Sequence, residues 1–399
     1  MNDKTADRLK LFFSTLFILL GGVLGFGLIG ILGSLGMFPL YVTRAVLVTG
    51  AAGTLAVAAL NTGFFGKRSL RYIGITFLCV AAGCAIYIGH GFYRDSFPAV
   101  DDRDLLLWQY EPFSEDNKLA SLDEPASLKM DTYVLPRLDG ATALYPVYAA
   151  FVQATYPEEQ EYGRYKGLVN CSGTVHAYER LINREVDMIF AAAPSQDQLD
   201  QAAKAGIQLH LTPIGREGFV FFVNSKNPVT DLTVEQVQGI YTGQISNWKE
   251  VGGRFQRIRP FQRDENSGSQ SALLRLMDGL PLMEPEEEDR IAGMGGIIRQ
   301  VASYRNYQNA IGFSFRYYST EMVQNGDIRL LALNGVEPTK ETIRDGSYPI
   351  ASEFYAVTAA PVGLPAPQDT NRHIAALLNW ILSQEGQELV ERTGYVSLQ

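Results

Sequence analysis

A short segment of the chain combines an arginine with small hydroxyl residues: RDENSGS, which runs from Arg263 to Ser269. An arginine guanidinium donates two parallel hydrogen bonds to an oxyanion, and the hydroxyls of Ser267 and Ser269 are further donors. The apolar residues that follow recur at helical spacing, so we expect a helix to begin here with unpaired backbone N–H groups. Gly268 lets a ligand approach those groups closely. The segment therefore predicts a site for a small tetrahedral or carboxylate anion.

Two further segments, each between an expected strand and an expected helix, offer similar chemistry. DGATA runs from 139 to 143 and NCSGT from 170 to 174, and each combines glycine with hydroxyl donors and helix-start N–H groups. Any one of the three segments is also explained by ordinary helix capping, with Arg263 as a surface residue. Together, and with an arginine among them, they favour a single site where hydroxyl and amide donors replace the water around an anion.

The elements that must position these segments differ between the two ends of the chain. Residues 11–40, 46–65 and 72–88 are almost entirely apolar, and a bilayer crossing needs about 20 such residues. Residues 1–92 are therefore predicted to form an all-α region of three transmembrane helices. A cleaved signal peptide is the weaker explanation, because the first apolar run is too long and two more follow it.

Basic residues predict how these helices are oriented. Lysine and arginine cluster at positions 4–10 and 67–71, before the first helix and between the second and third, whereas the first loop offers only Arg44. Such residues tend to stay on the cytoplasmic side. We therefore expect a multi-pass protein of an inner or plasma membrane with a cytoplasmic N-terminus. Everything after about Tyr93 is expected in the periplasm or outside the cell.

The first apolar stretch is rich in glycine: Gly21, Gly22, Gly25, Gly27, Gly30, Gly33 and Gly36. Spacings of three and four put most of these residues on one narrow face, where a neighbouring helix can approach closely. We expect this face to pack within the three-helix unit; the alternative is docking onto a separate membrane partner. No Asp, Glu or Lys lies in the middle of these helices, which argues against an ion or proton path.

The rest of the chain alternates expected strands and helices. Residues 93–130, without clear periodicity, are interpreted as a tether with some local order, and residues 131–399 as a two-lobed α/β domain. The expected strands are 133–138, 167–169, 186–190, 219–223, 258–261, 311–315 and 328–333, and the expected helices include 142–154, 175–183, 232–241 and 373–393. Such alternation is typical of parallel sheets, whose ligands lie at the carboxyl ends of the strands.

Composition argues against several other functions. The net charge is −9 and there is no run of lysine and arginine, so nucleic acid is not an expected partner. The 3 cysteines and 4 histidines show no disulfide framework and no metal-ligand spacing, so no metal or other cofactor is expected. Because the RDENSGS segment holds no histidine or lysine to activate its serines, no catalytic residue is predicted. The chain is interpreted as a binding protein rather than an enzyme.

From residue 139 to residue 398 the chain resembles the phosphate-binding protein of the bacterial phosphate ABC transporter. The segments that carry the resemblance, in family order, are DGATALYPVYAAF, NCSGTVHAYERLINREVDMIFAAAP, TPIGREGFVFFVN, LTVEQVQGIYTGQISNWKEVGG, RDENSGSQSALL, AIGFSFRYY and GQELVERTGYVSL. The resemblance implies a type II-like periplasmic-binding-protein fold, with an oxyanion held between two α/β lobes. It places lobe 1 at about 131–218 plus 350–399, lobe 2 at about 224–348, and hinge strands near 219–224 and 349–358.

The resemblance also implies which positions face the ligand: Thr142, Ala143, Cys171, Ser172, Arg263, Ser267, Gly268 and Ser269. Cys171 and Ser172 are alternatives for one serine of the family, and a thiol is a poor donor. Ser269 replaces a threonine of the family and keeps the hydroxyl. Ala143 offers its backbone N–H where the family usually has an aromatic residue.

One position departs from the family. Where phosphate binders typically carry an aspartate, this chain reads Ala191-Ala192-Ala193, with Ala192 at the equivalent position. In the family that carboxylate accepts a hydrogen bond from the protonated oxygen of hydrogenphosphate and repels anions that lack a proton. Asp264 and Glu265 are the candidates to replace it. Sulfate, a phosphonate or another oxyanion remains open as the ligand.

We therefore interpret the chain as a membrane-anchored, extracytoplasmic solute-binding protein. It is expected to capture a small oxyanion for uptake by an ABC transporter, and phosphate is the ligand that the resemblance implies. The alternative is a membrane-bound oxyanion sensor or assembly factor that uses the same domain without transport, because three helices are more than tethering requires.

Overall fold

In the computed structural model the chain forms two compact units, Met1–Pro98 and Ala99–Gln399. The structure describes residues 3–34, 38–62, 66–95, 107–130, 134–158, 167–286, 289–291, 308–323 and 325–398. Gly36 of the predicted first helix, Tyr133 of a predicted strand and residues 96–106 of the predicted tether lie outside these ranges. Each unit is described by itself.

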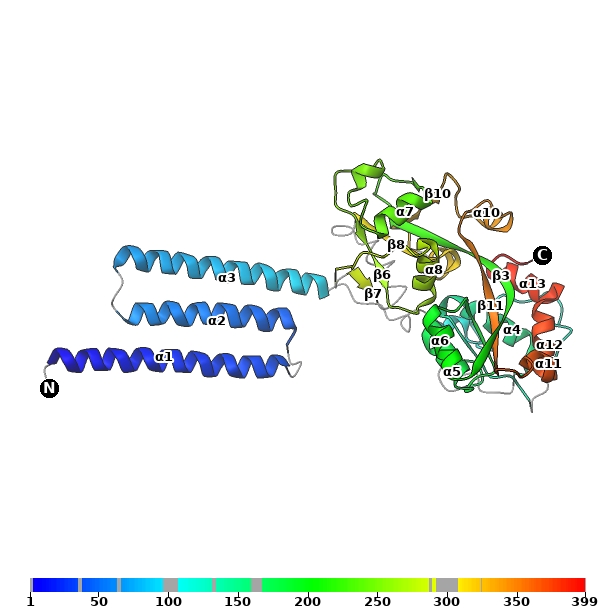
Figure 1. Ribbon diagram of the computed structural model, residues 1–399, viewed down its shortest axis with the longest axis horizontal. Coiled ribbons are helices and arrows are strands. Elements are labelled where there is room, and N and C mark those ends of the chain that lie inside the picture. The colour runs from blue at the N-terminus through cyan, green and yellow to red at the C-terminus, as the bar shows by residue number, and fades with distance from the viewer. Residues whose placement is uncertain are drawn as a thin grey trace. The chain divides into compact units, whose positions relative to one another are not determined.

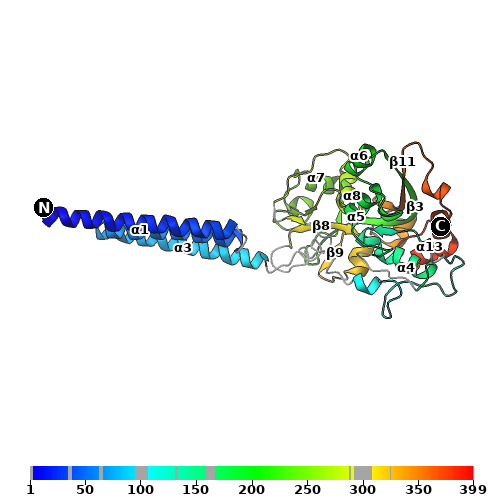
Figure 2. The same ribbon diagram turned by 90° about the horizontal axis from the view of Figure 1, so that it is seen from below.

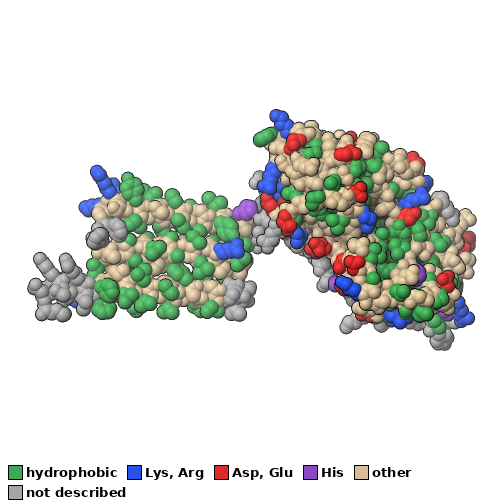
Figure 3. Space-filling view, viewed as in Figure 1, with side chains coloured by type: hydrophobic (Ala, Val, Ile, Leu, Met, Phe, Trp, Pro, Cys, Tyr) green, Lys and Arg blue, Asp and Glu red, His purple; other side chains and the backbone are tan. Residues whose placement is uncertain are grey.

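The first unit consists of three long helices (Figures 1 and 3): α1 (Asp3–Ser34), α2 (Leu40–Asn61) and α3 (Lys67–Asp95). All three are long and apolar enough to cross a membrane, within Lys10–Leu32, Leu40–Asn61 and Lys67–Phe92. Hydrophobic side chains cover much of the visible face of the unit in Figure 3. α2 packs against both α1 and α3, and Nδ2 of Asn61 donates to Ser14 Oγ (2.7 Å) and Thr15 Oγ1 (2.9 Å) of α1.

The glycine-rich face of α1 is only partly covered by its neighbours. Gly22 lies against Thr54 of α2, where an added Cβ atom would come within 2.6 Å of the threonine side chain. At Gly21, Gly25, Gly27 and Gly30, apart from the adjacent residues and the backbone of α1, no atom of the described residues lies within 4 Å of such an added Cβ. The expected close packing within the unit is therefore found at Gly22, where α2 contacts α1, and not at these four glycines.

The second unit is built around a seven-stranded mixed sheet. Its strands are, in spatial order, β1 (Leu138–Gly140), β2 (Met188–Ala192), β11 (Ala351–Pro361), β3 (Ile207–Asn224), β8 (Ala310–Phe315) and β5 (Arg259–Pro260), with β9 (Ile328–Leu330) also paired to β3. β1 and β2 are parallel, as are β5 and β8, whereas β11 is antiparallel to both its neighbours and β3 to β8 and β9. In this sheet, the parallel pairing predicted from the βα alternation is found in the pairs β1–β2 and β5–β8. It is absent from the middle of the sheet, because β11 runs in the direction opposite to both its neighbours.

The remaining elements are mostly helical. The helices are α4 (Tyr145–Thr155), α5 (Thr174–Ile182), α6 (Gln196–Lys204), α7 (Val234–Tyr241), α8 (Gly268–Met277), α10 (Lys340–Arg344), α11 (Pro367–Thr370), α12 (Arg372–Ile381) and α13 (Gln384–Thr393). Single turns are η2 (Leu107–Tyr110), η3 (Thr142–Leu144), η4 (Trp248–Val251) and the π-helical η6 (Tyr318–Met322). Short parallel strands pair as β4 (Asp231–Leu232) with β10 (Ala332–Leu333), and β6 (Gln262–Arg263) with β7 (Arg290–Ile291).

Three of the predicted elements are divided. The predicted helix 142–154 begins as the single turn η3 and continues as α4. The predicted strand 328–333 is split between β9 and β10. The predicted helix 373–393 consists of α12 and α13, because the chain turns at Leu382 and Ser383. Gly386 permits this turn: an added Cβ there would lie 2.4 Å from the carbonyl oxygens of Trp380 and Ile381.

β3 and β11 join two lobes, as Figure 1 shows. Residues of β1, β2, α4, α12 and α13 share one hydrophobic core, in lobe 1. Residues of β8, α7, α8 and the last part of β3 share another, in lobe 2, and Figure 2 shows α7 with β8 and α4 with α13 in different halves of the unit. β3 pairs with β11 as far as Gly218 and with β8 from Phe219 onward, so it changes partner where the predicted hinge segment 219–224 begins.

Residues 107–130, which were interpreted as part of a tether, pack onto lobe 1. Leu107, Tyr110 and Met130 are buried in its core. The backbone N–H of Met130 donates to the carbonyl oxygen of Thr155 (2.8 Å). Scattered apolar residues hold this segment against the domain, although they show no helical or strand period.

Candidate functional site

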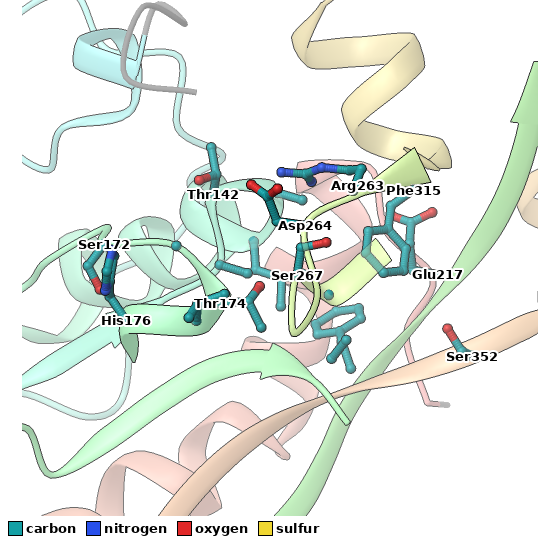
Figure 4. A pocket seen from close by; sticks show the side chains of 18 of the residues that line it. Thr142, Ser172, Thr174, His176, Glu217, Arg263, Asp264, Ser267, Phe315 and Ser352 are labelled. Carbon is teal, nitrogen blue, oxygen red and sulfur yellow. The ribbon is translucent and has the colours of Figure 1, made fainter. Parts of the chain in front are cut away.

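The three segments predicted to share a site meet at one cavity of about 170 Å³ in the second unit. Its wall includes most of the residues that the sequence analysis singled out: Thr142, Ala143, Ser172, Arg263, Ser267 and Gly268. The first three belong to lobe 1 and the others to lobe 2, so the cavity lies between the lobes (Figure 4). Cys171 and Ser269 are buried but do not form part of the wall.

Arg263 is held in place by the helix that follows it. Its backbone N–H donates to Oε1 of Gln270 (2.9 Å), and its Nη1 donates to Oγ of Ser269 (3.2 Å). Only 7% of the residue is exposed. Because a guanidinium stays protonated in proteins, a fixed positive charge forms part of the cavity wall. Ser269 is fully buried behind it and orients the arginine.

α8 begins at the cavity. Ser267 is its N-cap residue, and Oγ of Ser267 accepts a hydrogen bond from the backbone N–H of Gln270 (3.3 Å), which leaves the hydroxyl proton for another acceptor. At Gly268 an added Cβ would lie 3.1 Å from Thr174 Oγ1 and 3.7 Å from Ala192 Cβ, both in lobe 1. The unpaired N–H groups and positive dipole end of α8 therefore lie close to the opposite lobe, an arrangement that stabilises an anion between them.

A buried aspartate that the sequence analysis missed uses the hydroxyl of Ser172. Oδ1 of Asp139 accepts from the N–H groups of Gly140 (2.8 Å) and Ser172 (2.8 Å). Its Oδ2 accepts from Oγ of Ser172 (2.7 Å) and from Arg180. A serine hydroxyl has a single proton to donate. Ser172 therefore stabilises its own loop, and its oxygen is left as an acceptor. Asp139 begins the DGATA segment, so the motif pointed to the loop without revealing this role.

The RDENSGS segment also contacts lobe 1 directly, through Asn266. This residue has a left-handed backbone conformation (φ 67°), which asparagine tolerates better than most residues. Its Oδ1 accepts from Ser195 Oγ (2.6 Å) and its Nδ2 donates to Asp197 Oδ2 (2.8 Å). Its carbonyl oxygen accepts from Nε2 of Gln198 (3.4 Å). These partners lie at the start of α6, so the contacts join the loop that carries Arg263 to the opposite lobe.

Ala192 lines the cavity, and so do three acidic residues: Glu217, Asp264 and Glu353. Of the two residues predicted to replace the missing aspartate, Asp264 lines the cavity and Glu265 does not. Glu217 and Glu353 escaped the sequence analysis, because an isolated acid within a strand forms no motif. Among the residues that the structure describes, no group of three or more His, Cys, Asp or Glu side chains is arranged to hold a metal ion.

Comparisons with known proteins cover this same domain. A family model described as a PBP superfamily domain matches residues 135–385. The phosphate-binding protein PstS of Borreliella burgdorferi is 24% identical over 208 residues, 51% of this chain and 69% of that protein. PstS of Staphylococcus saprophyticus is 25% identical over 234 residues, 57% of this chain and 70% of that protein. A solved structure from Clostridium perfringens, described as a phosphate ABC transporter substrate-binding protein with bound phosphate, has a TM-score of 0.51 and 24% identity, and the match covers 66% of this chain and 98% of that one.

Proposed function

The chain belongs to the PBP superfamily, and we propose that its interlobe cavity captures a small oxyanion of the phosphate type. The family is non-enzymatic, and the predicted fold is confirmed: a periplasmic-binding-protein-like α/β domain preceded by three long helices. The observation that carries the proposal is the buried guanidinium of Arg263 beside the start of α8. Both features bind anions, and both belong to the wall of one cavity.

The proposed contacts come from both lobes. Arg263, the hydroxyl of Ser267 and the first N–H groups of α8 would bind the anion from lobe 2. Thr142 and the N–H of Ala143 would bind it from lobe 1. Ser172 and Ser269 would act indirectly, by holding Asp139 and Arg263 in place, and Cys171 would take no direct part.

We further propose that the domain lies outside the cytoplasm and delivers its anion to an ABC permease. The lysine and arginine clusters at 4–10 and 67–71 support this orientation, because such clusters remain cytoplasmic. A transport role is supported by the relatives, which are phosphate-binding proteins, and by the Clostridium perfringens protein, which is described as part of an ABC transporter.

A second candidate function is oxyanion sensing or assembly without transport. It is favoured by Gly21 and Gly25, which lie four residues apart on one face of α1, with open space around an added Cβ at each. A small-residue face on a transmembrane helix allows a second helix to pack closely, and a simple anchor has no need of it. Loss of phosphate uptake in cells that lack the protein would favour transport, whereas normal uptake with intact anion binding would favour sensing.

Calorimetric titration of the full-length protein in detergent, with inorganic phosphate and with sulfate, tests the capture of an anion. We expect saturable binding that Arg263→Ala weakens by about 10- to 150-fold, because a hydrogen bond to a charged group is worth about 1.5–3 kcal/mol. Arg254→Ala, at an exposed position in the same lobe, is the control and should bind like the wild type. Failure to bind either anion, or unchanged binding in Arg263→Ala, would contradict the proposal.

A further inference from the structure

One carboxylate in the cavity wall has an oxygen to which no residue in the described part of the chain donates. Glu217 lies on β3 beside the crossing between lobes and is 4% exposed. Its Oε1 accepts from the backbone N–H groups of Gly218 (3.0 Å) and Tyr317 (3.4 Å). Its Oε2 is buried without a hydrogen-bond partner. Because buried polar atoms are normally paired, and leaving one unpaired is costly, this oxygen indicates a donor that arrives with a ligand.

The basic side chains near Glu217 donate their hydrogen bonds to other acceptors. Burial raises the pKa of its carboxyl to about 7, while Arg316 and Lys340 favour the charged form. The side chains of Arg316 and Lys340 donate instead to the carbonyl oxygens of Gly394 (3.4 Å) and Glu391 (3.3 Å). The other titratable groups that face Glu217 are phenols whose pKa burial raises far above neutrality, Tyr317 and Tyr395. A cationic donor on a ligand would therefore meet an acceptor to which none of the described side chains donates.

The charge balance of the wall points the same way. Among the described residues of the wall, Arg263 is the one lysine or arginine, against three acids, Glu217, Asp264 and Glu353. A bare dianion would add to this negative charge, whereas a ligand that also carries a positive charge would offset it. Ala192 adds a second argument, because a P–OH group pointing at its methyl group would find no acceptor there. The fourth substituent on phosphorus is better matched by carbon or an ester oxygen.

The cavity extends from the anion-binding groups to Glu217. In the view of Figure 4, Ser172 and Glu217 lie on opposite sides, with Arg263, Asp264 and Ser267 between them. Phe315, Phe354 and Tyr395 also line the wall, and Phe315 lies 3.8 Å from a Cβ added at Gly268. Aromatic rings of this kind accommodate an alkyl arm or an ammonium group.

We propose that the ligand is zwitterionic: a small phosphonate or phosphate ester whose anionic head binds Arg263 and Ser267 and whose ammonium arm binds Oε2 of Glu217. The anionic half rests on the proposed function, and the ammonium half is new. Phosphonates and phosphate esters share this chemistry, and the choice between them is an outcome of the experiment.

The experiment compares matched ligands on the full-length protein in detergent by calorimetry. The probes are inorganic phosphate, ethylphosphonate, 2-aminoethylphosphonate and O-phosphoethanolamine. We expect 2-aminoethylphosphonate to bind at least about tenfold more tightly than ethylphosphonate, because it adds a charge-assisted hydrogen bond. Glu217→Gln keeps an oxygen for the N–H groups of Gly218 and Tyr317 but lacks the negative charge. It should abolish this preference without weakening the binding of ethylphosphonate, because it removes one negative charge from the wall. Glu265→Gln, in the RDENSGS segment but outside the wall, should retain the preference.

Each failure has a separate meaning. Equal affinity for the amino and ethyl compounds, with phosphate still bound, overturns the zwitterion proposal and leaves anion capture intact. A preference that persists in Glu217→Gln overturns the assignment to Glu217. If none of the four compounds binds, the proposed function itself fails. A tighter fit of O-phosphoethanolamine than of 2-aminoethylphosphonate identifies a phosphate ester as the ligand class, and the reverse order identifies a phosphonate.

Discussion

Asn266 offers the most direct test of whether the two lobes close around the ligand. Replacing it with glycine keeps the left-handed backbone, which glycine adopts without strain, and keeps the carbonyl oxygen that Gln198 contacts. The change removes the side-chain hydrogen bonds to Ser195 and Asp197. Each such bond contributes about 0.5–1.5 kcal/mol. The bond to Ser195 is partly buried and the bond to Asp197 is exposed, so the closed arrangement should lose about 1–2 kcal/mol.

That loss appears as weaker binding, because a ligand that binds only the closed arrangement must first restore it. We expect the affinity of Asn266→Gly for its anion to fall by about 5- to 30-fold, with an unchanged melting temperature. Calorimetry measures the affinity, and a distance between spin labels at the exposed residues Lys204 and Glu235 reports the opening of the lobes.

The matched control is Gln201→Ala. The Gln201 amide donates to the same Asp197 (2.8 Å), but from within lobe 1. This variant should bind like the wild type. The reasoning is refuted if Asn266→Gly and Gln201→Ala have the same affinity and the same distance between labels.

Three further predictions concern single positions in the wall. Gly268→Ala places a Cβ 3.1 Å from Thr174 Oγ1, so it should obstruct closure of the two lobes. Anion binding should weaken by about tenfold or more, with little change in melting temperature. Normal affinity would mean that the lobes do not need to approach each other at this position. Ser172→Ala removes one hydrogen bond from Asp139, so it should lower the free energy of unfolding by about 1–2 kcal/mol and change the anion affinity less than about threefold. Ser267→Ala, in contrast, should weaken anion binding. Calorimetry and thermal melting distinguish the two variants, and the opposite pattern would restore Ser172 as a ligand contact. Glu217 has a pKa of about 7 in the folded protein against 4.5 as its ordinary value, so its stabilising contribution is complete below about pH 4.5 and is lost as the pH rises to about 7. The unfolding free energy of the wild type relative to Glu217→Gln should therefore fall by roughly 3 kcal/mol between pH 4.5 and 8, and a difference that does not vary with pH would show that Glu217 titrates normally.

The parts of this protein that depend on neighbouring residues could be predicted from the sequence. Three long apolar runs identified α1, α2 and α3, because helix length and hydropathy are local properties. Ser267 and Gly268 identified the start of α8, because an N-cap is satisfied by Gln270, three residues further on. Arg263 was found with them for the same reason. The insertion of β11 between β2 and β3 was not predictable in this way, since its partners lie far away in the chain.

The sequence by itself determined that an arginine, a serine and a helix start would stand together, because all three lie within one short segment. Only the tertiary structure decided where the hydroxyl protons point and which acids reach the cavity. Ser172 donates to Asp139, 33 residues away, and Ser269 accepts from Arg263 instead of forming part of the cavity wall. Glu217 lines the same wall as Arg263 although no motif connects them. A donor pairs with an acceptor that lies near it in space, and that position is set by the fold of the whole domain rather than by spacing along the chain.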